Sequence, residues 1–185
     1  MNKKLNLQEK LGKLNFNRIA IADDLLENLV AAKEFTSNLN EIQFEFYDNG
    51  QDLISQILGN YKNLDLILTD RNMETKDSGL DVIETAWNYL VPAYIVSGGY
   101  SHANKEKVMI TPDSFGISDG LTKDKAFFWE YTIDKLCDLA LNNNRSLIST
   151  LVMVKRIGIE KLSDDFLGTT VRSIAKTDLD ILEKK

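Results

Sequence analysis

The 185-residue sequence has one cysteine, one histidine and two prolines, and these scarcities exclude several classes of protein. The single cysteine, Cys137, excludes an internal disulfide, and together with His102 it is too little for a zinc site of cysteine and histidine ligands. Cys137 falls in a helical pattern, where we expect a buried small side chain rather than a reactive thiol. Few prolines and a hydrophobic content of 43% are typical of a globular chain rather than a disordered one.

The sequence also lacks a long apolar run and an excess of positive charge. No stretch has the length of a membrane span, and the charged start MNKKLNLQEK lacks the apolar core of a signal peptide, so we expect a cytoplasmic protein. The formal net charge is −6, and residues 145–185, with eight basic and six acidic side chains, are only mildly basic. Because nucleic acids are held mainly by Lys and Arg, we expect no nucleic-acid partner, and we expect no membrane partner.

Strand-like and helix-like patterns alternate along most of the chain. Apolar residues spaced three or four apart predict helices, and short apolar or alternating runs closed by turn residues predict strands. This rhythm predicts an α/β fold with a doubly wound, five-stranded parallel sheet, the flavodoxin-like arrangement of order 2-1-3-4-5. Pro112 and Gly116 limit the helix before the last strand to a short or distorted one. The five predicted strands lie in RIAIADD, EIQFEFYDNG, LDLILTD, PAYIVSGG and DGLTK.

Acidic residues follow two of these predicted strands. Asp23 and Asp24 end the first strand, and Asp70 ends the third. Since the first and third strands are neighbours in such a sheet, we expect three carboxylates at one edge, where ligands of open α/β sheets bind. Like charges at close range call for a cation, and oxygen ligands suit Mg²⁺. Ser97, after the fourth strand, and Lys123, at the fifth, add a hydroxyl and an ammonium group to the same edge.

These residues lie in motifs that resemble a known family, the receiver domains of bacterial two-component response regulators. The motifs IADD, LILTDRNM, SGLDVI, IVSG and LTK occur in the family's order, over roughly residues 17–143. Their separations also match: 46 residues from Asp24 to Asp70, then 27 to Ser97 and 26 to Lys123. Each motif alone is weakly specific, whereas the ordered set is fairly specific.

The resemblance implies a role for each matching residue and a set of partners. Asp70 would be the phosphoacceptor that forms an aspartyl phosphate, and Ser97 and Lys123 would contact the phosphoryl group or the carboxylate. A histidine kinase or a histidine phosphotransfer protein would supply the phosphoryl group, and a downstream protein would receive the signal through protein–protein contacts. Mg²⁺ would be held by Asp23, Asp24, Asp70 and the backbone carbonyl of Asn72.

Three positions depart from the family's pattern. Glu74 follows Met73 where the family often has proline, and Asp124 follows Lys123 where proline is also usual. Gly120 lies three residues before Lys123, at a position that is usually aromatic and swings inward on activation. A glycine has no side chain to swing, so we expect an altered output face.

The resemblance divides the chain into three parts: a polar leader over residues 1–16, a receiver-like domain over 17–144 and a helical extension over 145–185. The stretch SLISTLVMV in the extension has more apolar residues than one helical stripe needs. We therefore expect the extension to form a homodimer or a partner surface, with packing onto the domain as the alternative.

Other readings of the same residues stay open. Asp24 alone would be read as a cap of the following helix. A pseudo-receiver, which keeps the fold and binds partners without phosphorylation, is the main alternative function. A Mg²⁺-dependent phosphatase with an aspartate nucleophile is a further one, but it needs a second acid two residues after the nucleophile, where this chain has Asn72.

Overall fold

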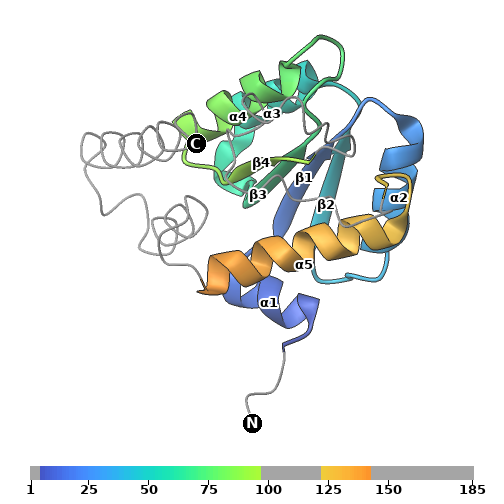
Figure 1. Cartoon of the computed structure of the whole chain (residues 1–185). Coiled ribbons are helices and arrows are strands. Elements are labelled where there is room, and N and C mark those ends of the chain that lie inside the picture. Colours follow the sequence, from blue (N-terminus) through green and yellow to red (C-terminus); the bar gives the residue numbers. More distant parts are fainter. Residues whose placement is uncertain (1–4, 97–121, 143–185) are drawn as a thin grey trace, which may run out of the picture.

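The computed structural model describes residues 5–96 and 122–142, which form a parallel sheet with helices on both faces (Figure 1). No helix in these described ranges is long and apolar enough to cross a membrane. In chain order, the elements are α1 (Leu7–Leu14), β1 (Arg18–Ala22), α2 (Leu26–Thr36), β2 (Gln43–Tyr47), α3 (Gly50–Asn60), the short 3₁₀ helix η1 (Tyr61–Asn63), β3 (Leu66–Thr69), α4 (Ser78–Asn88), β4 (Ala93–Ile95) and α5 (Ala126–Asn142).

The described sheet has four parallel strands in the order β2-β1-β3-β4. This confirms the α/β class and the predicted order of the first four strands. Of the predicted fifth strand, only Thr122 and Lys123 lie among the described residues, and they precede α5 in a turn. The segment with Pro112 and Gly116, where a distorted helix is expected, lies outside the described residues.

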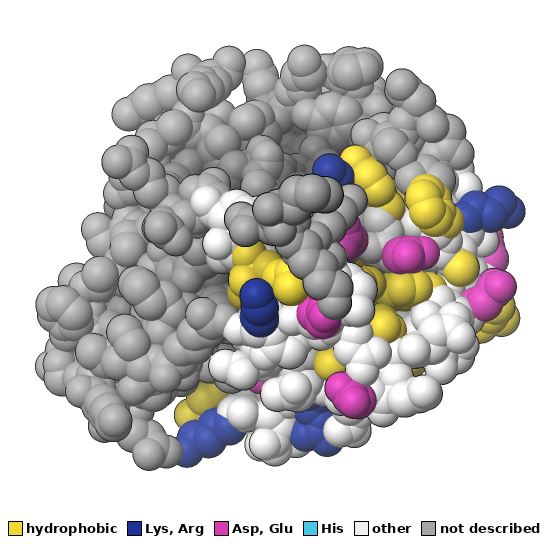
Figure 2. Space-filling model, turned by 90° about the horizontal axis from the view of Figure 1, so that it is seen from below, with side chains coloured by type: hydrophobic (Ala, Val, Ile, Leu, Met, Phe, Trp, Pro, Cys, Tyr) yellow, Lys and Arg dark blue, Asp and Glu magenta, His cyan; other side chains and the backbone are white. Residues whose placement is uncertain are grey.

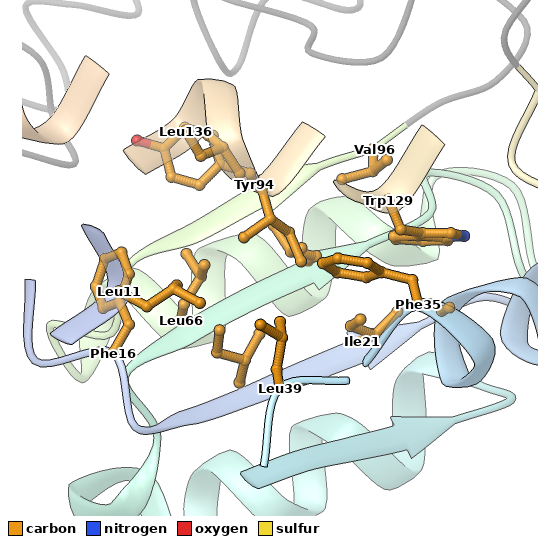
Figure 3. Close-up of a cluster of buried hydrophobic side chains, with 14 of the residues drawn as sticks. Leu11, Phe16, Ile21, Phe35, Leu39, Leu66, Tyr94, Val96, Trp129 and Leu136 are labelled. Atoms are coloured by element: carbon orange, nitrogen blue, oxygen red, sulfur yellow. The ribbon is translucent and has the colours of Figure 1, made fainter. Parts of the chain in front are cut away.

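Alternate residues of the strands feed two separate hydrophobic cores. On one face of the sheet, Ile19 and Ile21 join a cluster that α1, α2 and α5 cover, and Figure 3 shows its large side chains meeting between these layers. On the other face, Ala20 and Ala22 join a cluster that α3 and α4 cover. Both faces of β1 are therefore buried, which explains why its sequence is apolar throughout rather than alternating.

The predicted polar leader contains a helix, α1, that belongs to the core. Asn6 and Glu9 form a capping box at its start: the Glu9 amide donates to Asn6 Oδ1 at 2.9 Å, and the Asn6 amide donates to Glu9 Oε2 at 2.8 Å. Leu11 and Leu14 are buried in the cluster that α5 also joins. The helix is short and polar on one side, so its composition hides an apolar stripe.

A buried lysine joins α1 to α5. Lys10 is 3% exposed, and its Nζ lies 2.6 Å from a carboxylate oxygen of Asp134 and 2.6 Å from one of Asp138. Burial lowers the pKa of Lys10, but the hydrogen bonds to both carboxylates outweigh this effect and raise it above 10.5. The ammonium group therefore stays charged and fixes the direction in which α1 lies on α5.

On the surface seen from below (Figure 2), the described residues show no concentration of one charge. On the described part of the face in Figure 2, acidic, basic and hydrophobic side chains are interspersed. The described residues of this face (Figure 2) form no continuous basic patch of the kind that holds a phosphate backbone.

Two neighbouring substitutions in α1 are expected to change stability in opposite directions. Leu11→Ala removes a fully buried side chain and should lower the free energy of unfolding by about 3 kcal/mol. Gly12→Ala adds a methyl group with no atom within 4 Å and favours the helix, so it should raise this free energy by about 0.5–1 kcal/mol. Urea unfolding measures both, and two near-zero effects would show that α1 does not pack on the domain.

Candidate functional site

The ends of β1 and β3 place two acids side by side. The two strands pair in parallel, and their last paired residues are Ala22 and Thr69. The Asp70 amide donates to the Ala22 carbonyl at 2.8 Å, and the Asp23 amide donates to the Tyr47 carbonyl at 3.1 Å. The sheet's own hydrogen bonds therefore fix both acids one residue beyond the strands.

The Lys123 ammonium group lies between these two carboxylates. Its Nζ donates to Asp23 Oδ2 at 2.6 Å and also to Asp70 Oδ1. Asp23 is 0% exposed and Lys123 is 8% exposed, so both charges are removed from most contact with water. Each charge then depends on its partner, because an unpaired buried charge is costly.

The second oxygen of Asp23 is also used. Asp23 Oδ1 accepts hydrogen bonds from the Leu25 amide at 3.1 Å and from Asn28 Nδ2 at 2.9 Å, and Asn28 is buried. Leu25 directly precedes α2, which has no side-chain cap of its own. Asp23 therefore accepts a hydrogen bond from a backbone amide at the start of α2. The reading of Asp24 as the helix cap is wrong.

The backbone of Asp70 and Arg71 lies close against the start of α4. The Asn72 amide donates to Asp70 Oδ2 at 2.9 Å, and the Gly79 amide donates to the Arg71 carbonyl at 2.9 Å. A Cβ atom at Gly79 would lie 1.9 Å from the Asp70 carbonyl oxygen. Only glycine permits this approach, which explains the glycine in SGLDVI.

The turn that carries Lys123 is held by α5. The indole Nε1 of Trp129 donates to the Lys123 carbonyl at 2.8 Å, and the Lys125 amide donates to the Thr122 carbonyl at 3.1 Å. Trp129 is 1% exposed and meets Phe128 edge-on. Trp129 is thus a packing residue, and its hydrogen bond also fixes the backbone of Lys123.

An open pocket of about 690 Å³ lies at this edge of the sheet. Asp24 lines this pocket and is exposed. Partial desolvation, followed by the charges of Asp23 and Asp70, raises the pKa of Asp24 above its usual 3.8. The three carboxylates are therefore close enough to repel one another. The lining consists of Asp23, Asp24, Leu25, Glu27, Asn28, Asp70, Asn72, Thr122, Lys123 and Asp124.

The negative charge of the pocket suits a divalent cation, but its described side chains do not form a complete set of metal ligands. Among the described residues, no group of three or more His, Cys, Asp or Glu side chains is arranged to hold a metal ion. Lys123 occupies one oxygen of Asp23 and one of Asp70. One ammonium group against three mutually repelling carboxylates still leaves a surplus of negative charge, which a hard cation with oxygen ligands offsets.

The remaining candidates are placed as follows. Asn72 is exposed and lines the pocket, whereas Ser97 and Gly120 lie outside the described residues. Cys137 is buried, and burial raises the pKa of its thiol to about 12, so it is a packing residue, as predicted, rather than a nucleophile.

Removing the charge of Asp24 is expected to stabilise the metal-free fold. The raised pKa means that the folded chain binds this proton more tightly than the unfolded chain does, so the ionised group costs stability at neutral pH. Asp24→Asn should raise the free energy of unfolding by at most about 1 kcal/mol, since Asp24 is exposed and screened. The gain should shrink as the pH falls toward 3.8.

Urea unfolding at several pH values measures this gain. Glu84→Gln, an exposed acid in the middle of α4, is the matched control and should have no such effect. An equal gain in both variants would contradict repulsion within the pocket.

Removing Lys123 is expected to be strongly destabilising. Lys123→Ala leaves the buried Asp23 without a cation and should lower the free energy of unfolding by about 3–5 kcal/mol. Lys125→Ala, at the exposed neighbouring lysine, should change it by less than about 0.5 kcal/mol. Adding Asp23→Asn to Lys123→Ala should recover part of the loss, and equal losses in the two lysine variants would exclude the buried pair.

Scans of the chain against models of protein families and against curated proteins find no match.

Proposed function

We propose that the chain is a receiver that accepts a phosphoryl group on Asp70. The observation that carries this proposal is the contact of one lysine with two strand-end acids, since Lys123 Nζ bonds to both Asp23 and Asp70. A structural role alone does not call for these groups to line an open acidic pocket. A nucleophilic carboxylate, a cation beside it and free volume in front of it are what phosphoryl transfer to an aspartate requires.

The chemistry is a direct displacement at phosphorus. One carboxylate oxygen of Asp70 bonds to phosphorus while the bond between phosphorus and the leaving group breaks. The leaving group is acetate when acetyl phosphate is the donor, and an imidazole nitrogen, which then takes up a proton, when the donor is a phosphohistidine. The Lys123 ammonium group stays within reach of Asp70 and balances charge on the phosphoryl oxygens.

A divalent cation belongs to this proposal because the acids outnumber the bases. Asp23, Asp24, Asp70 and the backbone carbonyl of Asn72 would hold Mg²⁺, which would offset the negative charge of the incoming phosphoryl group. Asp23 and Asp70 share Lys123, so the lysine contacts must rearrange when the acids take a metal.

The wider setting follows from the same proposal. A fifth strand through DGLTK would complete the sheet, and Ser97 would contact the phosphoryl group. A histidine kinase or histidine phosphotransfer protein in the cytoplasm would be the donor, and a downstream protein the recipient of the signal. Residues 145–185 would provide a surface for a homodimer or for that partner.

A pseudo-receiver is the second candidate, and one observation favours it. Lys123 pairs with both Asp23 and Asp70 without any metal, so these two carboxylates already have a cationic partner. A chain that keeps this arrangement would use the fold to bind partners and would not turn over phosphate.

Phosphorylation is expected on Asp70 alone. Incubation with acetyl phosphate and Mg²⁺ should raise the intact mass of the protein by one phosphoryl group, because the pocket admits a small donor. Asp70→Asn should abolish the adduct, whereas Asp81→Asn, at an exposed acid on α4, should keep it. Mg²⁺ should also raise the melting temperature of the wild type but not of Asp24→Ala.

These measurements separate the two candidates. No mass change and no Mg²⁺-dependent stabilisation would support the pseudo-receiver. An adduct that persists in Asp70→Asn would reject Asp70 as the acceptor.

A further inference from the structure

We propose that Glu74 is a positioning residue that anchors the loop beside Asp70 to the N-terminus of α3. This role rests on the proposed function of Asp70 as phosphoacceptor. Glu74 stands where the receiver pattern often has proline, and its side chain provides an anchor that a proline cannot form.

The anchor consists of two hydrogen bonds between segments far apart in the sequence. Glu74 Oε2 accepts from the Gly50 amide at 2.8 Å, and Glu74 Oε1 accepts from the Gln51 amide at 3.1 Å. Both amides belong to the first turn of α3, whose free N–H groups and dipole favour a negative charge. The carboxylate of Glu74 therefore binds an end of a helix that lies 23 and 24 residues earlier in the chain.

Glu74 is more than a helix cap, because α3 already has one. Asn49 Oδ1 accepts from the Asp52 amide at 2.8 Å, which is the ordinary side-chain cap of this helix. The bonds from Glu74 are thus additional for α3. For the loop between β3 and α4, the same bonds provide an attachment to α3 in addition to its attachment to α4.

The contact is closely packed as well as hydrogen-bonded. A Cβ atom at Gly50 would lie 3.1 Å from Glu74 Oε1 and 3.1 Å from the Met73 methyl carbon. Met73 is 8% exposed, and its amide donates to Ser78 Oγ at 3.1 Å. The absence of a side chain at Gly50 lets both Met73 and Glu74 approach α3.

The anchor reaches Asp70 through two residues of backbone. Asn72, which immediately precedes Met73, donates its amide to Asp70 Oδ2 at 2.9 Å. Glu74 on the α3 side and Ser78 on the α4 side therefore hold the short segment that orients this carboxylate oxygen. Loss of the α3 anchor frees one side of the segment, and the Asn72 amide no longer has a fixed direction.

Three variants test the anchor from both of its ends. Glu74→Ala removes it, and Glu74→Gln keeps an oxygen that still accepts one hydrogen bond. Gly50→Ala crowds it from the opposite side while placing a better helix former in α3. Glu84→Ala, at an exposed glutamate in the middle of α4, is the control.

The rate of adduct formation from acetyl phosphate, at saturating Mg²⁺, is the main measurement. Glu74→Ala and Gly50→Ala should each lower the maximal rate by about 10-fold, because small misplacements of reacting groups have effects of this order. The half-saturating acetyl phosphate concentration should stay the same, and Glu74→Gln should fall between Glu74→Ala and the wild type. The double variant should be no slower than the slower single variant, since both changes break one contact.

Hydrogen exchange gives a second readout that needs no phosphorylation. Peptides covering residues 70–78 should exchange faster in Glu74→Ala, while those covering residues 53–60 should not, because Asn49 still caps α3. Unchanged rates and unchanged exchange in the variants, beside a reactive wild type, would overturn the role of Glu74 alone. A wild type that forms no adduct would overturn the proposed function, and this role with it.

Discussion

The arrangement of the site depends on one constraint: a carboxylate with no exposure to water must be neutralised and hydrogen-bonded by the protein. Asp23 meets this constraint through the ammonium group of Lys123, the amide before α2 and the side chain of Asn28. Two of these partners follow Asp23 within five residues, whereas Lys123 lies 100 residues after it. Because the cost of an unpaired buried charge is large, the start of α2 and the turn before α5 must both be in place for the fold to be stable.

Much of this arrangement can be predicted from the sequence, and the exceptions have physical causes. The switch between strand and helix patterns predicts β1 to β4, and parallel topology then brings Asp23 and Asp70 to one edge. The helix α1 escapes prediction because it is short and its apolar stripe alternates with charged residues. The hydrogen bonds of Asn28 and Trp129 to the site escape prediction too, since each depends on a contact that only tertiary packing creates.

The two halves of the site differ in how they are held. The side that carries Asp70 is fixed by backbone and side-chain hydrogen bonds of the loop to α3 and α4, and a Cβ atom at Gly79 would overlap the Asp70 carbonyl oxygen. The side that carries Lys123 is a turn attached to α5 through one indole hydrogen bond and a hydrophobic ring.

The docking of α1 on α5 has a consequence for how the chain is made. Lys10 and Asp134 are 124 residues apart, so α1 leaves the ribosome long before its partner has been synthesised. During that interval Leu11 and Leu14 have only part of the cluster in which they are buried in the folded chain, and the face of the sheet that α5 covers is still incomplete. The nascent chain therefore exposes apolar surface until α5 emerges, and surface of this kind favours aggregation.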